Sequence, residues 1–181
     1  MSQYRRVWVP GATYFFTVNL LERRRTLLVD EIDALRHAFR AAYASRSFDV
    51  LAIVVLPDHL HCVWRLPDGD ADNATRWRHI KSTFSRYCKP GERRSRRRLV
   101  KGERGIWQRR YWEHLIGDED DLRRHVDYVH FNPVKHGYVE RAADWRYSSI
   151  HRFIARGEMA VDWGCDATCD AGGGEGAGGE K

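Results

Sequence analysis

The clearest alternation of hydrophobic and polar residues lies in the middle of the chain. An apolar, β-branched run over 50–56 predicts a buried strand, and Pro57-Asp58 predicts a tight turn after it. Residues 59–66 then alternate with period 2, which predicts a second strand with His59 and His61 on the same face, roughly 7 Å apart. We expect the opposite, leucine-bearing face to pack inward and the histidine face to stay free to hold a ligand.

Similar patterns predict the remaining elements. Strands are expected over 12–20 and 111–116, helices over 31–46, 71–87 and 119–135, and a short helical extension over 145–156. This order gives an α+β fold, a ferredoxin-like βαββαβ antiparallel sheet with an additional C-terminal helix that carries Tyr128. Residues 1–165 are expected to form one domain, and the Gly-rich tail 166–181 to be disordered.

Charge narrows the class of partner. The chain has 181 residues, 43% of them hydrophobic, which is sufficient for one globular domain with its own core. Its net charge is +6, and because the last sixteen residues carry −3, the preceding domain carries +9. Only 5 of the 31 basic residues are Lys, and Arg recognises phosphate and stacks on bases better than Lys. An Arg-rich domain with 7 Trp and 8 Tyr is suited to nucleic acid. Charge for solubility alone is the other interpretation.

The sequence shows no recognisable targeting signal and no paired cysteine motif. The first residues lack the apolar segment of a signal peptide, and no apolar run approaches the length of a membrane helix. The 4 Cys form no paired CxxC motif, which fits free thiols in a reducing compartment. We therefore expect a cytoplasmic protein with no membrane partner.

The histidine pair is a candidate metal half-site, because two neutral imidazoles aimed at one point bind divalent ions. A purely structural role for His59 and His61 is equally open from this stretch alone. On the helix over 119–135, Tyr128 and Asn132 are four residues apart and share a face. Two imidazoles and an amide oxygen suit Mg²⁺ or Mn²⁺ with room for phosphate, whereas a structural Zn²⁺ site needs four N or S ligands.

Several segments together resemble a known family, the REP-associated tyrosine transposases, which use an HUH motif (His, bulky hydrophobic residue, His). The matching segments are Tyr4-Arg5-Arg6, residues 10–17, residues 56–61, residues 107–112, residues 128–139 and residues 145–149. The family often has Arg-Ala-Gly-Leu where this chain has Lys135-His136-Gly137-Tyr138, and Met where it has Leu56. These departures leave the matched catalytic residues unchanged.

The resemblance implies that Tyr128 is the nucleophile and that His59, His61 and Asn132 hold the metal ion. It also implies cutting of single-stranded DNA at a hairpin from repetitive extragenic palindromes, through a 5′-phosphotyrosine intermediate. The arm Tyr4-Arg5-Arg6 would help to read a short tetranucleotide beside the hairpin. The active unit would be a monomer or homodimer associated with the nucleoid.

Other residues have two interpretations each. The basic run Arg93, Arg94, Arg96, Arg97 and Arg98 is either a DNA-phosphate contact or a solvated loop, and Lys135 adds positive charge beside the nucleophile. The proton of Tyr128 would pass to His130, Lys135 or a metal-held water. Trp107 and Trp112 either stack on unpaired bases or belong to the core, and the core role is favoured. For His114 and His125 a structural role is favoured over a catalytic one. The rival functions are a non-catalytic binder of structured single strands and a zinc-stabilised RNA-binding fold.

Overall fold

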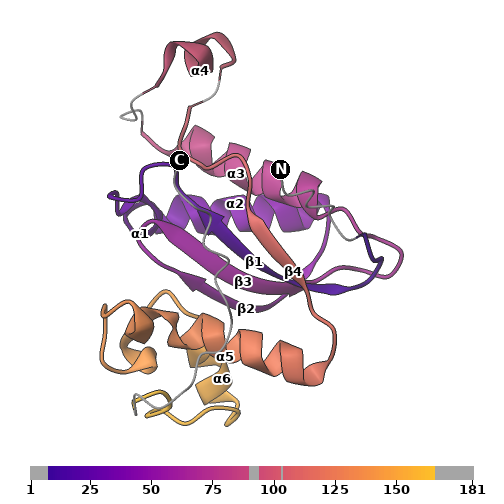
Figure 1. Cartoon of the computed structure of the whole chain (residues 1–181), viewed down its shortest axis with the longest axis vertical. Coiled ribbons are helices and arrows are strands. Elements are labelled where there is room, and N and C mark those ends of the chain that lie inside the picture. The colour runs from indigo at the N-terminus through magenta and orange to yellow at the C-terminus, as the bar shows by residue number, and fades with distance from the viewer. Residues whose placement is uncertain (1–7, 90–93, 103, 166–181) are drawn as a thin grey trace, which may run out of the picture.

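The computed structural model describes residues 8–89, 94–102 and 104–165, which form a four-stranded antiparallel sheet between two layers of helices (Figure 1). The elements in chain order are β1 (Thr13–Asn19), α1 (Leu27–Asp30), α2 (Ile32–Ser45), β2 (Asp49–Val55), β3 (His59–Arg65), α3 (Asn73–Tyr87), α4 (Arg96–Val100), β4 (Trp112–Leu115), α5 (Glu119–Lys135), the 3₁₀ turn η1 (Ala142–Asp144) and α6 (Ile150–Ala155). The predicted arm 4–6, Arg93 and the tail 166–181 lie outside the described residues.

The strand order β2-β3-β1-β4, with every pair antiparallel, is that of a ferredoxin-like sheet. The sequence prediction of this α+β fold is therefore confirmed. Each predicted strand is present within one or two residues of its expected bounds. The short elements α1, α4 and η1 were not predicted, since segments of three to five residues show too little periodicity.

One face of the sheet packs on α2 and α3. Tyr14, Phe16 and Val18 of β1 point to this side and join Leu60 and Trp64 of β3 in the larger hydrophobic core. The alternation of period 2 in both strands produces this face, because every second side chain points to the same side. Figure 1 shows the two helices lying side by side over it.

The other face of the sheet is covered by α5, with α6 beyond it (Figure 1). A smaller core of Phe15, Val54, Val63 and Val129 lies between this helix and the strands. The prediction of a free histidine face is wrong for this reason. Six of the seven residues of β3 are buried, and only Arg65 at its end is exposed.

The segment 145–149 closes the edge of the sheet instead of forming the predicted helical extension. The Ser149 N–H donates to Ile53 O at 2.8 Å, and the Val55 N–H donates to Tyr147 O at 2.9 Å. An edge strand whose backbone groups are paired in this way is protected from association with another chain. Helix α6 begins only at Ile150.

Both ends of α5 are capped. Asp118 caps the first turn by accepting a hydrogen bond from the Asp121 N–H at 2.8 Å. The helix ends at Lys135, and Gly137 follows it with a φ of +69°, the left-handed conformation common after the last helical turn. Tyr138 N–H then donates to Pro133 O at 2.9 Å, so the final carbonyl groups are satisfied. These ends fix which residues of α5 face the sheet.

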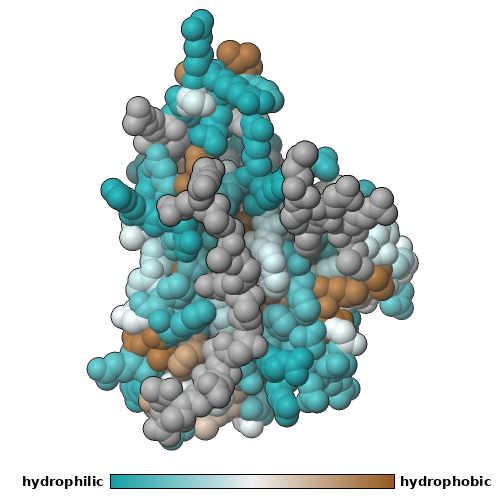
Figure 2. Space-filling model, in the orientation of Figure 1, coloured by the Kyte–Doolittle hydropathy of each residue, from teal (hydrophilic) through white to brown (hydrophobic). Residues whose placement is uncertain are grey.

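The basic run forms a short helix that projects from the body of the molecule. Helix α4 lies in the long connection between α3 and β4 and extends away from the sheet (Figure 1). Figure 2 shows hydrophilic atoms over most of this projection and hydrophobic atoms near its tip. Leu99 and Val100 of α4 are 53% and 83% exposed. No helix of the described residues has the length and hydrophobicity needed to cross a bilayer.

Candidate active site

The sheet-facing side of α5 carries a stripe of polar and aromatic side chains. Its members, spaced three or four residues apart along the helix, are Asp121, His125, Tyr128, Asn132 and His136. Because α5 crosses the sheet, successive members meet different strands: His125 stacks with His114 of β4, Tyr128 contacts His61 of β3, and His136 contacts His59. The stripe is the result of helical periodicity in a segment whose apolar residues form the neighbouring core.

The predicted nucleophile lies beside the histidine pair. The ring centroids of Tyr128 and His61 are 5.2 Å apart and those of His59 and His61 are 5.0 Å apart. Phe15 of β1 packs between the tyrosine and the strands, with its centroid 5.8 Å from that of Tyr128 and 5.6 Å from that of His61. Tyr128 is half-buried, so part of the residue remains accessible to solvent.

The Nδ1 atoms of both histidines are occupied, and the Nε2 atoms remain for a ligand. His59 Nδ1 bonds Asp58 Oδ1 at 2.7 Å, and His61 Nδ1 bonds Thr17 Oγ1 at 2.9 Å. Metal-binding histidines have such partners on the other ring nitrogen, which fix the ring and the tautomer. Asp58 in turn accepts from Arg23 Nε at 2.7 Å. Sequence analysis missed Thr17 and Asp58 because a hydrogen bond across a sheet or a turn leaves no periodic signal.

Two buried atoms could hold an ion. Within the described part of the chain, His61 Nε2 and Asn132 Oδ1 make no hydrogen bond of good geometry, although the Asn132 side chain is close enough to His61 to raise its pKa, and both residues are fully buried. A buried acceptor without a partner costs roughly 1–3 kcal/mol, so such atoms indicate a site for an ion or water. The donor set of two imidazoles and one amide oxygen fits a divalent ion that keeps open positions for phosphate oxygens.

The electrostatics keep the imidazole in its metal-binding form. Burial lowers the pKa of His61 well below its ordinary value, and the neighbouring His59, His136 and Lys135 lower it further. A neutral imidazole has a free lone pair, whereas a protonated one has none. Burial alone would raise the pKa of Asp58, but hydrogen bonds from His59 and Arg23 outweigh burial and lower it to about 2.

The two side chains proposed to accept the Tyr128 proton lie in different places. Lys135 Nζ lies 4.9 Å from the centroid of the Tyr128 ring. His130 is fully buried on another side of α5, where its Nε2 bonds Ser149 Oγ at 2.9 Å and its ring packs against Phe153. The structure therefore brings Lys135 to the candidate nucleophile and places His130 away from it.

The other predicted residues are spread over the molecule. Arg96, Arg97 and Arg98 lie on α4 and Arg94 just before it, whereas Tyr4, Arg5, Arg6 and Arg93 are outside the described residues. Trp107 is 8% exposed and belongs to the core as predicted, but Trp112 is 42% exposed, so its predicted core role is wrong. Its ring stacks on His114 at the rim of the α5-covered face.

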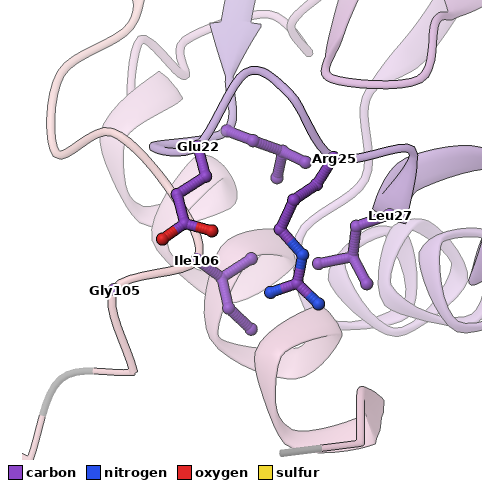
Figure 3. A pocket seen from close by; sticks show the side chains of 6 residues that line it. Glu22, Arg25, Leu27, Gly105 and Ile106 are labelled. Atoms are coloured by element: carbon purple, nitrogen blue, oxygen red, sulfur yellow. The ribbon is translucent and has the colours of Figure 1, made fainter. Parts of the chain in front are cut away.

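Two pockets lie outside the histidine site. A cavity of about 10 Å³, lined by residues that include Glu22, Arg25 and Ile106, has room for about one water molecule (Figure 3). A larger hollow of about 370 Å³ lies between α2 and α3, beside His37 and His79. The helices that form it cover the face of the sheet opposite α5, so it is separate from the histidine site.

Comparisons with known proteins agree with this fold and show the family. The family model described as "Transposase IS200 like" matches residues 11–132, which is most of the chain. The chain is 46% identical over 168 residues to the REP-associated tyrosine transposase of Escherichia coli strain K12, covering 93% of this chain and 94% of that one. It is 45% identical over 166 residues to the putative REP-associated tyrosine transposase of Haemophilus influenzae strain Rd, covering 91% and 94%.

A solved structure gives the same result. The structure of a REP-associated tyrosine transposase bound to a REP hairpin superposes with a TM-score of 0.80 at 44% identity, covering 100% of this chain and 98% of that one. The fold and the sequence together define a tyrosine transposase of the IS200-like class. Within that class, the chain belongs to the REP-associated tyrosine transposases.

Proposed function

We propose that this chain cuts and rejoins single-stranded DNA beside palindromic hairpins of the REP type, with a divalent metal ion and through a 5′-phosphotyrosine intermediate. The observation that carries the proposal is the contact between Tyr128 and His61, whose ring centroids are 5.2 Å apart. A tyrosine hydroxyl, which can attack phosphorus, thus lies beside buried nitrogen and oxygen atoms that could hold a metal ion. The binding of a REP hairpin by a relative at 44% identity supports the choice of substrate.

His59, His61 and Asn132 would hold the ion, and Mg²⁺ or Mn²⁺ suits a site with one amide oxygen and space for phosphate. When bound, such an ion neutralises charge that develops on a phosphate in the transition state. Asp58 and Thr17 orient the two imidazoles through their Nδ1 atoms. Their role is to keep both Nε2 atoms directed at one point.

Tyr128 then attacks the phosphorus atom of the scissile phosphodiester. The phenol oxygen forms a bond to phosphorus, the bond to the 3′ oxygen breaks, and that oxygen takes up a proton and leaves as a 3′-OH. A free phenol has a pKa of about 10, so its proton must be removed during attack. The nearby Lys135 cation, 4.9 Å from the ring, stabilises the developing phenolate. A second 3′-OH can reverse the step and join strands without a nucleotide cofactor.

The basic residues would hold the hairpin. Arg96, Arg97 and Arg98 of α4, with Arg93 and Arg94 before it, are suited to the phosphates of the stem. Lys135 adds charge at the cleavage point. The arm Tyr4-Arg5-Arg6 would read the unpaired tetranucleotide beside the hairpin foot. The protein would act as a monomer or homodimer at the nucleoid, where its DNA substrate is located.

The test is a covalent adduct on a hairpin oligonucleotide with a single-stranded flank. We expect a Mn²⁺- or Mg²⁺-dependent protein–DNA band that resists denaturation and disappears in Tyr128→Phe, while hairpin affinity stays within about twofold. Tyr43→Phe, a change on the exposed surface of α2, is the matched control and should leave the adduct intact. An adduct that persists in Tyr128→Phe refutes the assigned nucleophile. Binding without any adduct in the unsubstituted chain supports the rival function, a non-catalytic binder.

A further inference from the structure

A second group of metal-ligating side chains lies near the start of α5. Ligand atoms of His114, Asp121 and His125 all lie within 4.8 Å of one another. His114 comes from β4, whereas Asp121 and His125 are one turn apart on α5. Their side chains are 38%, 13% and 18% exposed, so the cluster is accessible to a small ion from solvent.

Asp121 contacts both histidines, and one backbone N–H from outside the cluster holds its carboxylate. Asp121 Oδ2 accepts from the Gly117 N–H at 3.0 Å and bonds His114 Nε2 at 2.8 Å, and Asp121 Oδ1 lies 3.0 Å from His125 Nδ1. The two imidazoles stack with centroids 4.6 Å apart and planes 16° apart. Two imidazole nitrogens thus converge on one carboxylate, and these three side chains can bind one divalent cation.

We propose that His114, Asp121 and His125 form a second divalent-metal site, distinct from the histidine pair of β3, and that Zn²⁺ is the ion that fits it. Two imidazole nitrogens and one carboxylate oxygen are ligands that Zn²⁺ accepts, and the fourth tetrahedral position is left for water. The nitrogen content disfavours Mg²⁺ and Ca²⁺, which take oxygen ligands. An ion would replace the direct contacts of Asp121 with the two imidazoles, which lie at 2.8 and 3.0 Å, so the ligand atoms would shift by small amounts to receive it.

The position of this site gives it a role in holding the nucleophile. An ion there links β4 to α5 three residues before Tyr128. Phe15 connects the two regions, since its ring centroid lies 4.8 Å from that of His125 and 5.8 Å from that of Tyr128. The ion would thus fix the helix that presents the tyrosine. This inference does not depend on the proposed function, because it concerns binding and stability.

The test is zinc binding to the full chain after treatment with a chelator. We expect His114→Gln and His125→Gln each to bind one Zn²⁺ per chain fewer than the unsubstituted protein, and to lose most of the rise in Tm that zinc produces. Glutamine retains a hydrogen-bond donor toward Asp121 but is a poor zinc ligand, so a structural hydrogen bond would survive the change. His37→Gln/His79→Gln, in the hollow between α2 and α3, is the matched control and should bind as many ions as the unsubstituted protein.

Unchanged zinc stoichiometry and an unchanged Tm response in the His114 and His125 variants would overturn the proposal. Nitrogen-15 spectra of the histidine rings decide the same question in the unsubstituted chain: ring signals of His114 and His125 that do not move at saturating zinc also overturn it. A His59→Gln/His61→Gln variant separates the two sites, because it should retain the zinc response while losing the covalent adduct.

Discussion

The Tyr128 ring meets the His61 imidazole edge-on, with planes at 77° and centroids 5.2 Å apart, within a single chain. The two residues are far apart in the sequence and come from α5 and β3. They meet because α5 packs across the face of the sheet that carries the histidines. The proposed nucleophile and the proposed metal ligands therefore lie side by side within one chain.

This arrangement predicts the outcome of mixing two inactive variants. Tyr128→Phe lacks the nucleophile and His59→Ala/His61→Ala lacks the imidazoles, so neither chain holds both parts. We expect the mixture to form less than about one hundredth of the wild-type adduct, because no chain can complete its own site. The measurement is adduct yield on a hairpin oligonucleotide after co-refolding. Recovery of a quarter or more of wild-type yield would show that the tyrosine of one subunit serves the histidines of another.

Asp58 is expected to control metal affinity without touching the ion. Its carboxylate bonds His59 Nδ1 at 2.7 Å, and the negative charge makes the imidazole a better ligand. Asp58→Asn should weaken Mn²⁺ binding by roughly 10–100-fold, measured by calorimetry, with little change in hairpin affinity. Asp49→Asn removes a carboxylate that pairs with Arg65 at the surface and is the matched control. Equal Mn²⁺ affinity in the Asp58 variant and the control would remove Asp58 from the site.

Much of the fold could be predicted from sequence, because period 2 and helical spacing are local signals. The placement of Tyr128 near the histidine pair followed from a family resemblance. What could not be predicted depends on which strands become neighbours. Thr17 reaches His61 only because β1 pairs with β3, and His114 reaches His125 only because β4 lies at the edge of the sheet beneath the start of α5.

Burial also limited prediction from sequence. Arg76 of α3 is charged, yet it is only 1% exposed, and the hydrophobic pattern of the helix does not reveal this. A polar residue can be buried wherever the surrounding chain supplies enough hydrogen-bond acceptors, and those acceptors come from loops whose course the pattern does not reveal. The histidine face of β3 was expected to be free to hold a ligand for a related reason. Period 2 shows which residues share a face, but it does not show which layer of the fold covers that face.

The arginines of α4 are expected to contribute to hairpin binding through charge. Replacing Arg96, Arg97 and Arg98 with Ala should weaken binding and reduce the slope of log K against log salt by roughly 0.7–0.9 for each lost phosphate contact. The measurement is hairpin affinity at several salt concentrations. A matched triple variant of Arg36, Arg40 and Arg46, at α2 on the opposite side of the sheet from α5, should leave the slope nearly unchanged. Equal slopes for the α4 variant and the unsubstituted protein would exclude α4 from the DNA interface.

The buried Arg76 network is expected to dominate the stability of the α2–α3 side. Its guanidinium donates to Asp70 Oδ2 at 2.8 Å and to Ser47 O at 2.6 Å. Arg76→Ala leaves these acceptors without their donor and should cost roughly 3–5 kcal/mol of unfolding free energy. Arg78→Ala, an exposed change on the same helix, should stay within about 0.5 kcal/mol.

The same network predicts a dependence on pH. The hydrogen bond from Arg76 lowers the pKa of Asp70 below its ordinary value of 3.8, so ionised Asp70 stabilises the fold above that pH. As the pH falls below 3.8, the carboxylate of the unfolded chain is protonated first, and the contribution of Asp70 is lost progressively until its lower folded-state pKa has been passed. The stability difference between the unsubstituted protein and Asp70→Asn, measured by urea unfolding, should therefore be present at pH 7 and shrink by pH 3. A difference that is equal at both pH values would mean that the charge of Asp70 contributes nothing, and that only the shape of its side chain matters.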